Sequence, residues 1–163
     1  MKKLAVFLMM LCCLGIAARA QEVPAPAPLT GVEKVDRFLS ETGAFFLATT
    51  DGKRPHLRPL GMHFVADGKL WFGVGDFKQV YKQLKKNPRV EIVALKKNGH
   101  WLRYAGRAVF TKDDKYAQKA LEMAPNLRAI YNEQTGNKLG IVAVENGYAE
   151  IADMGGGFES FNF

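Results

Sequence analysis

Apolar residues recur at helical spacing in two segments, residues 31–41 and 77–87. The apolar positions are Val32, Val35, Phe38 and Leu39 in the first segment, and Phe77, Val80, Tyr81 and Leu84 in the second. Asp76 is placed to cap the second helix, and the Asn-Pro pair at 87–88 is placed to end it. A third helix is predicted after Thr111, which can cap it, and a further helical turn over residues 125–132.

Seven apolar or alternating segments indicate strands between these helices. They are residues 44–50, 56–66, 69–74, 89–97, 100–111, 139–144 and 148–152. Hairpin turns are predicted at four Asp-Gly or Asn-Gly pairs, which begin at Asp51, Asp67, Asn98 and Asn146. Because most connections between strands are hairpins, the prediction is an α+β fold whose mainly antiparallel strands form a barrel with flanking helices.

Residues 1–20 have the order of a secretory signal peptide. A short basic start is followed by an apolar stretch over residues 4–16, and the run Ala18-Arg19-Ala20 has small residues at the two positions that a signal peptidase reads. Cleavage before Gln21 would leave a periplasmic or secreted protein with no membrane span. The alternative is an uncleaved membrane anchor, but the apolar stretch is short for one.

Both cysteines, Cys12 and Cys13, lie inside this predicted signal. The chain after cleavage would therefore contain no disulfide and no cysteine metal ligand. Lipidation is the minor alternative, because the large residue Leu11, rather than a small one, precedes Cys12.

The charge balance changes once the signal is set aside. The 163-residue chain carries a net charge of +7, and residues 1–20 account for three cations and no acid. The remaining excess does not require a nucleic-acid partner. Residues 21–30, rich in proline and alanine, are predicted to be an extended linker before a single domain over residues 31–163.

The common catalytic motifs are absent from the chain, including GxSxG, HExxH and the GxxxxGK phosphate loop. The histidines His56, His63 and His100 are not spaced as metal ligands, so no metal site is predicted. His56 or His63 could still bind a haem iron, although a lone histidine is more often an ordinary surface or core residue.

Three segments could bind a planar anionic ligand. In residues 54–61, Arg58 and His56 share one strand face, and Pro59 interrupts regular pairing. Lys78 opens a helix, where an anion is favoured, just after two glycines. In residues 100–107, alternation places Trp101, Arg103 and Arg107 on one face. Each segment has an alternative interpretation. Arg58 could be an ordinary solvated arginine, Lys78 could belong to a solvated basic helix face with Lys82 and Lys85, and residues 100–107 could form a protein interface.

Four runs of sequence together resemble the small, FMN-binding split-barrel proteins related to pyridoxamine 5′-phosphate oxidase. They are FFLATTDGKRPHLRPLG, KLWFGVGDFKQVYKQLKKNPRVEI, GHWLRYAGRAV and APNLRAIYN. The resemblance extends from Phe38 to the C-terminus, and residues 78–92 are its most specific part. Many relatives carry hydroxyl and amide residues where this chain has Val-Gly-Asp-Phe at 74–77.

The resemblance implies a split barrel that forms a homodimer with two FMN sites at the subunit interface. In such proteins the residues matching Arg58, Pro59, Leu60 and Gly61 lie along the flavin and its phosphate, and those matching Phe72, Gly73 and Val74 back the cofactor. The lysine matching Lys78 pairs with the phosphate. The residues matching Trp101 and Arg103 approach the flavin, typically from the partner chain.

The sequence therefore favours an exported, homodimeric FMN-binding protein of the oxidoreductase type that acts on a small-molecule redox substrate. The flavin would supply the redox chemistry, and no protein acid or base stands out. The alternative is a non-catalytic module in which the same barrel holds haem or another planar ligand. The visible absorbance of the purified protein separates these hypotheses.

Overall fold

The computed structural model describes residues 27–163, so the predicted signal peptide and residues 21–26 lie outside the described residues. The first element, α1 (Gly31–Thr42), agrees with the helix predicted at 31–41. Thr30 caps it by accepting a hydrogen bond from the backbone of Glu33, whose carboxylate in turn accepts one from the backbone of Thr30. Within residues 27–163, no helix combines the length and apolar character that crossing a membrane requires.

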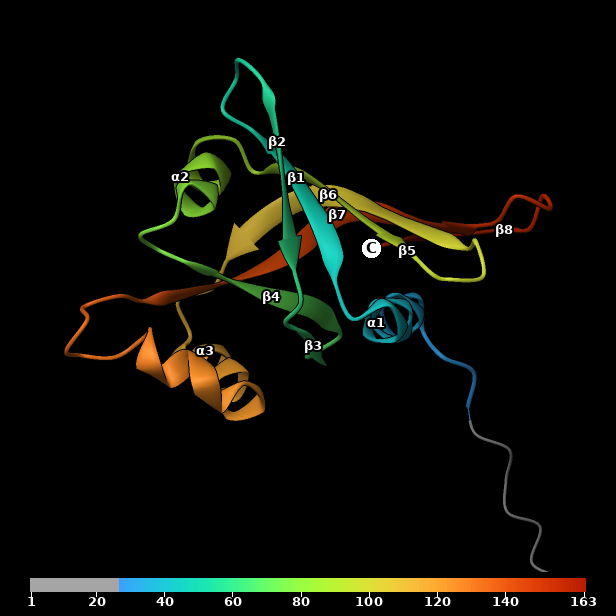
Figure 1. Ribbon diagram of the computed structural model, residues 1–163. Coiled ribbons are helices and arrows are strands. Elements are labelled where there is room, and N and C mark those ends of the chain that lie inside the picture. Colours follow the sequence, from blue (N-terminus) through green and yellow to red (C-terminus); the bar gives the residue numbers. More distant parts are fainter. Residues whose placement is uncertain (1–26) are drawn as a thin grey trace, which may run out of the picture.

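The strands form one curled, antiparallel sheet (Figure 1). They are β1 (Phe45–Thr50), β2 (Pro55–Leu60), β3 (His63–Ala66), β4 (Lys69–Gly75), β5 (Arg89–Leu95), β6 (Trp101–Phe110), β7 (Leu139–Ala152) and β8 (Phe158–Asn162). Their order is β2-β1-β5-β6-β7-β4-β3, with β8 also paired to β7. The predicted α+β class and mainly antiparallel split barrel are confirmed.

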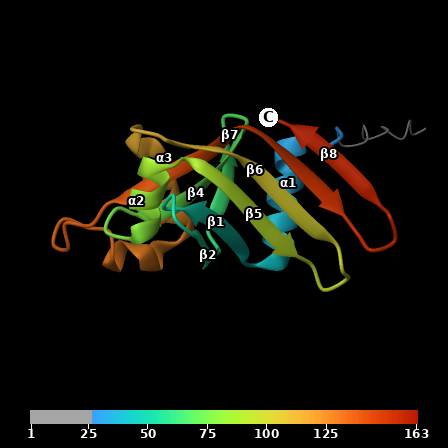
Figure 2. The same ribbon diagram turned by 90° about the horizontal axis from the view of Figure 1, so that it is seen from above.

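The helices cover different parts of this sheet. Figure 2 shows α1 against one face of β5 and β6, and α1 also packs on β3 and β4. α2 (Gln79–Lys86) packs on β1 and β4, and α3 (Asp114–Met123) packs on β7 and on the short helix η1 (Pro125–Ala129). Each helix buries the apolar stripe that its sequence carries.

The main core fills the inside of the curled sheet. Its largest fully buried side chains include Leu39 of α1, Phe45 and Leu47 of β1, Phe72 of β4 and Tyr104 of β6. A second cluster lies on the opposite face of β4, where Trp71 stacks on Tyr116 of α3 with ring centroids 4.2 Å apart. β4 is therefore buried on both faces, which explains why consecutive residues of this strand are apolar.

The single strand predicted over residues 56–66 is wrong, because the structure has two strands there. β2 pairs with β1 and β3 pairs with β4, so these two consecutive strands lie at opposite ends of the strand order. Gly61 and Met62 form the link between them. This short link draws the two ends of the sheet together and closes it into a half-barrel.

The hairpin predicted around Asn146 and Gly147 is also wrong, because residues 139–152 form one strand, β7. The positive φ of Asn146, 49°, is accommodated in a bulge opposite residues 105–107 of β6. A Cβ atom at Gly147 would lie 2.0 Å from the carbonyl oxygen of Ala105, so only glycine fits this position. The last hairpin is instead formed by β7 and β8, a strand that the sequence pattern did not indicate.

Two predicted helix caps are replaced by neighbouring residues. Lys78 is the N-cap of α2 and makes no side-chain cap, while the carboxylate of Asp76 accepts a 3.0 Å hydrogen bond from the backbone N–H of Lys138. Asp113 caps α3, and the hydroxyl of Thr111 accepts a bond from the backbone of Asp113. Asp76 thus ties the β4–α2 connection to the loop before β7.

A buried polar cluster joins β1, β2 and α2, and we call it the Thr49–Arg58–Gln83 cluster. The Thr49 hydroxyl donates to Oε1 of Gln83 at 2.7 Å, and the two terminal nitrogens of Arg58 donate to Thr49 Oγ1 and Gln83 Oε1, both at 2.8 Å. Thr49 and Gln83 are only 4% and 9% exposed. Burial lowers the pKa of the Arg58 guanidinium, which remains charged at neutral pH.

Replacing Thr49 with valine should destabilise the fold, because valine keeps the shape but removes one donor and one acceptor from this buried cluster. We expect a loss of about 1–3 kcal/mol in the free energy of unfolding, measured by urea denaturation. Thr50→Val is the matched control, since the Thr50 hydroxyl makes exposed bonds in the adjacent turn. Equal losses for the two variants would contradict a structural role for the buried cluster.

Candidate functional site

A cavity of about 520 Å³ lies between the β1–β2 connection and α2, and we call it the basic pocket. It is lined by Asp51, Arg54, His56, Gln79, Lys82, Gln83 and Lys86. The first three residues come from the β1–β2 hairpin, and the other four share one face of α2. A cavity of this size can admit a substantial part of a small molecule.

The charge of the basic pocket is largely uncompensated. Asp51 is its one carboxylate, and it is already engaged by Nε2 of His56 at 2.9 Å and by the backbone N–H groups of Lys53 and Arg54 at 2.8 and 3.1 Å. The hydrogen bond from His56 is the main cause that holds the pKa of Asp51 far below its usual value, and the backbone bonds add to it.

The three cations of the pocket are Arg54, Lys82 and Lys86. Among residues 27–163, no carboxylate lies within 4.0 Å of any of their charged nitrogens. Three cations and one carboxylate leave the pocket with a net positive charge, which attracts an anion. The basic pocket is therefore the strongest candidate for an anion site in the described part of the chain.

The structure places Arg58 and Lys78 differently with respect to this pocket. Arg58 lies directly behind Gln83, on the inner side of the pocket wall. Lys78 is exposed at the start of α2, where its Nζ lies 5.9 Å from the centre of the Phe77 ring, and it does not line the pocket. The two residues thus flank the pocket wall without facing a common cavity.

The residues expected to back a flavin lie along two other strands. Pro59 and Leu60 belong to the edge strand β2, and Gly61 follows it. The side chains of Phe72 and Val74 are buried in the main core. A Cβ atom at Gly73 would lie 2.5 Å from Cε of Met62 and 3.0 Å from a methyl group of Leu139, so these two side chains cover the backbone there.

Trp101 and Arg103 share one face of β6, as the alternation predicted, and this face is the outer face of the sheet. Nε of Arg103 is 2.8 Å from Glu91 on β5, and its Nη1 is 3.5 Å from Glu150 on β7. Hydrogen bonding to Glu91 is the main cause that raises the pKa of Arg103. Two carboxylates of the same chain thus neutralise this arginine, and one subunit does not bring it together with Arg58 or Lys78.

The outer sheet face carries large exposed apolar side chains on β1, β2 and β5. Phe46, Leu57 and Leu95 are 46%, 66% and 67% exposed. Phe46 lies opposite Val93, and Leu95 lies opposite Trp101, so the apolar surface continues from strand to strand. These exposed apolar side chains adjoin the charged pair Arg103–Glu91 on the same face.

Sequence reasoning missed Asp51, Gln79, Gln83 and Lys86 as pocket residues, and it named the 54–61 segment without singling out Arg54. The local signal for the three residues on α2 is their spacing with Lys82, because positions 79, 82, 83 and 86 share one face of a helix. The predicted basic face that groups Lys78, Lys82 and Lys85 is divided in the structure. The Nζ of Lys85 lies 4.1 Å from the centre of the Phe110 ring, away from the pocket.

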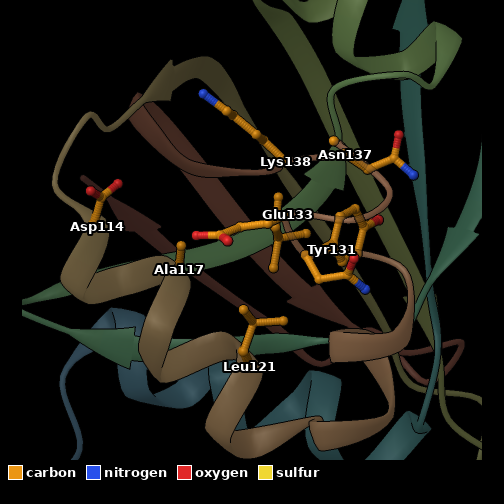
Figure 3. Close-up of a pocket in the computed structure, with 10 residues that line it drawn as sticks. Asp114, Ala117, Leu121, Tyr131, Glu133, Asn137 and Lys138 are labelled. Atoms are coloured by element: carbon orange, nitrogen blue, oxygen red, sulfur yellow. The ribbon is translucent and has the colours of Figure 1, made fainter.

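A second cavity of about 390 Å³ lies between α3 and the loop before β7 (Figure 3). Ala117, Leu121 and Leu139 provide apolar walls, and the Glu133 side chain extends across the cavity toward α3. Tyr131 stands at the opposite end. Burial and then the charge of Asp76 raise the pKa of Tyr131.

The described residues contain no group of three or more histidine, cysteine, aspartate or glutamate side chains that could share a metal ion. His63 has both ring nitrogens engaged. Its Nδ1 lies 3.3 Å from the Gly61 carbonyl oxygen, and its Nε2 lies 3.2 Å from the Ser40 hydroxyl and 3.5 Å from a carboxylate oxygen of Asp36.

Solved structures with this fold come from several bacteria. A NimC/NimA family protein from Clostridium acetobutylicum is 32% identical, with a TM-score of 0.75 over 82% of this chain and 92% of that one. A heme binding protein from Mycobacterium smegmatis is 16% identical, with a TM-score of 0.63 over 84% and 60%. An FMN binding, pyridoxamine 5′-phosphate oxidase-related protein from Nostoc punctiforme is 16% identical, with a TM-score of 0.50 over 84% and 99%.

The last two similarities show the fold alone. No curated protein matches the chain significantly. The family profile described as pyridoxamine 5′-phosphate oxidase matches residues 32–147, which is most of the predicted domain. Together with the half-barrel topology and the 32% identical relative, this match shows that the chain belongs to the pyridoxamine 5′-phosphate oxidase family of split-barrel proteins.

Proposed function

We propose that the protein binds FMN as an exported homodimer and acts as an oxidoreductase-type flavoprotein on a small-molecule substrate. The family contains FMN-binding members, and one structural neighbour is described as FMN binding. The observation that carries the proposal is the basic pocket, whose unpaired cations suit the phosphate of FMN.

FMN would supply the electron-transfer chemistry, while the chain binds and orients it. The basic pocket would hold the phosphate end of the molecule. The chain between β2 and β3, with Gly61 and Met62, and the Gly73 region of β4 would contact the planar part, since Met62 touches Gly73. The positive charge of the pocket suits the phosphate of FMN, and the apolar side chains of Met62 and Leu139 beside Gly73 suit its flavin ring.

Haem is the alternative ligand, because another structural neighbour is described as heme binding. His56 and His63, the two candidate iron ligands, favour FMN over haem. Both ring nitrogens of His63 are engaged by Gly61, Ser40 and Asp36. His56 lies among the cations of the basic pocket, and the apolar face of a porphyrin does not suit such walls.

The purified protein should show a flavin absorption spectrum, either as isolated or after reconstitution with FMN. FMN should bind at least about tenfold more tightly than riboflavin, because only FMN carries a phosphate for the basic pocket. Fluorescence titration with the two flavins measures this ratio. A haem Soret band from the isolated protein, or equal affinity for the two flavins, would argue against the proposal.

The outer sheet face supports the proposed homodimer. It carries large exposed apolar side chains in one subunit, together with Trp101 and Arg103, the residues for which the family resemblance implies an approach from the partner chain. A stable dimer interface of this kind buries on the order of 2,000 Å².

The double substitution Phe46→Glu and Leu95→Glu should convert the dimer to a monomer, because it places carboxylates in the centre of the apolar face. Light scattering at micromolar concentration measures the mass, and circular dichroism checks the fold. Met154→Glu is the matched control, since Met154 is 90% exposed in the turn between β7 and β8. A wild-type protein of monomer mass would rule out the proposed dimer.

Export is proposed from residues 1–20 alone. Native protein from the periplasm or culture medium should have the intact mass of a chain that begins at Gln21. A cytosolic protein that retains residues 1–20 would contradict export.

A further inference from the structure

We infer that the anion in the basic pocket is bound by the side-chain amide of Gln83, and that Arg58 is a positioning residue that orients this amide. The ligand class is a phosphate monoester. The inference rests on the proposed function only for the identity of that monoester as FMN. It differs from the role that the family resemblance implies for Arg58 and Lys78, which is direct contact with the phosphate.

The orientation of the Gln83 amide follows from its partners. An arginine side chain can only donate hydrogen bonds, so the Gln83 atom that faces Nη2 of Arg58 at 2.8 Å must be the oxygen. The Thr49 hydroxyl donates to the same oxygen at 2.7 Å. Both contacts hold the oxygen on the inner side of the pocket wall, and the amide nitrogen therefore faces away from Arg58.

The amide nitrogen of Gln83 is a donor group without an acceptor. Gln83 is 9% exposed and lines the basic pocket, and its Nε2 makes no hydrogen bond to any residue of the described chain. In the described chain, every side-chain N or O atom that is sealed from solvent has a hydrogen-bond partner. Because Nε2 of Gln83 has none, it must be accessible to solvent. Its two N–H groups are thus directed at the pocket, where an anion would satisfy them.

The surrounding charges complete an anion site. Arg54, Lys82 and Lys86 line the same cavity with no carboxylate within 4.0 Å in residues 27–163. The Arg58 guanidinium lies behind Gln83 and adds a charge at longer range, while its two terminal nitrogens are occupied by Thr49 and Gln83. Lys78 is outside the cavity lining.

Gln83→Glu tests the amide without disturbing its anchoring. A glutamate keeps an oxygen for Thr49 and Arg58 but replaces the N–H groups with a second oxygen. We expect the affinity for inorganic phosphate, measured by calorimetry on the full-length or processed protein, to fall at least about tenfold with no loss of unfolding free energy. Gln79→Glu is the matched control, because it adds the same charge at the exposed rim of the pocket and should have a smaller effect.

The role of Arg58 is tested by a double-mutant cycle with Gln83→Leu and Arg58→Met. If Arg58 acts mainly by holding the amide, each single variant loses phosphate affinity and the loss in the double variant is smaller than the sum of the two single losses. Circular dichroism checks that the double variant folds, because the Thr49 hydroxyl loses both of its partners there. Additive losses would mean that Arg58 contacts the anion itself and would overturn its positioning role.

Two further measurements distinguish the remaining outcomes, phosphate binding by Lys78→Ala and a comparison of FMN with riboflavin. If Lys78→Ala weakens phosphate binding as much as Gln83→Glu does, the anion lies at the start of α2 and the inference is wrong. The inference is also wrong if Gln83→Glu has no effect. If phosphate binds through Gln83 but FMN does not bind, the inference stands and the proposed flavin function fails. Loss of FMN affinity in Gln83→Glu with riboflavin affinity unchanged supports both.

Discussion

The half-barrel depends on one covalent constraint, which is the short link between β2 and β3. These strands lie at opposite ends of a seven-strand order, and only Gly61 and Met62 separate them. Laid flat, seven strands would place the two edges roughly 29 Å apart, because neighbouring strands are about 4.8 Å apart. A link of two residues spans about 11 Å between the flanking Cα atoms. The sheet must therefore curl until its edges meet, and this curl encloses the main core.

The curl also determines what the helices can cover. α1 packs against the inner side of the sheet, with Val35, Phe38 and Leu39 in the core, and α3 covers the outer side of β4 and β7. The outer face of β1, β5 and β6 keeps exposed apolar side chains such as Phe46 and Leu95. A family member that binds a ligand between two subunits needs an uncovered face of this kind, which is why we place the proposed dimer interface there.

The Thr49–Arg58–Gln83 cluster connects the fold to the proposed site. Burying Thr49 and Gln83 beside the partly buried Arg58 is costly unless the three satisfy one another, and here Thr49 and Arg58 both donate to the same oxygen of Gln83. The same contacts that dock α2 onto β1 and β2 also fix which end of the Gln83 amide faces the basic pocket. One set of hydrogen bonds thus serves both the packing of α2 and the binding of an anion.

Sequence alone determined the features that depend on neighbouring residues. Periodicity located the helices, Asp-Gly and Asn-Gly pairs located three of the four hairpin turns, and the family motifs indicated the split barrel. Tertiary structure decided the features that depend on distant partners. The break at Gly61 arises because β2 and β3 pair with different strands, and the pair Asn146-Gly147 forms a bulge because β6 continues past it. Lys82 and Lys85 look equivalent in sequence, yet Lys82 lines the basic pocket while Lys85 lies over Phe110. The pocket joins a hairpin to a helix face some thirty residues away, and no local pattern in the chain encodes that contact.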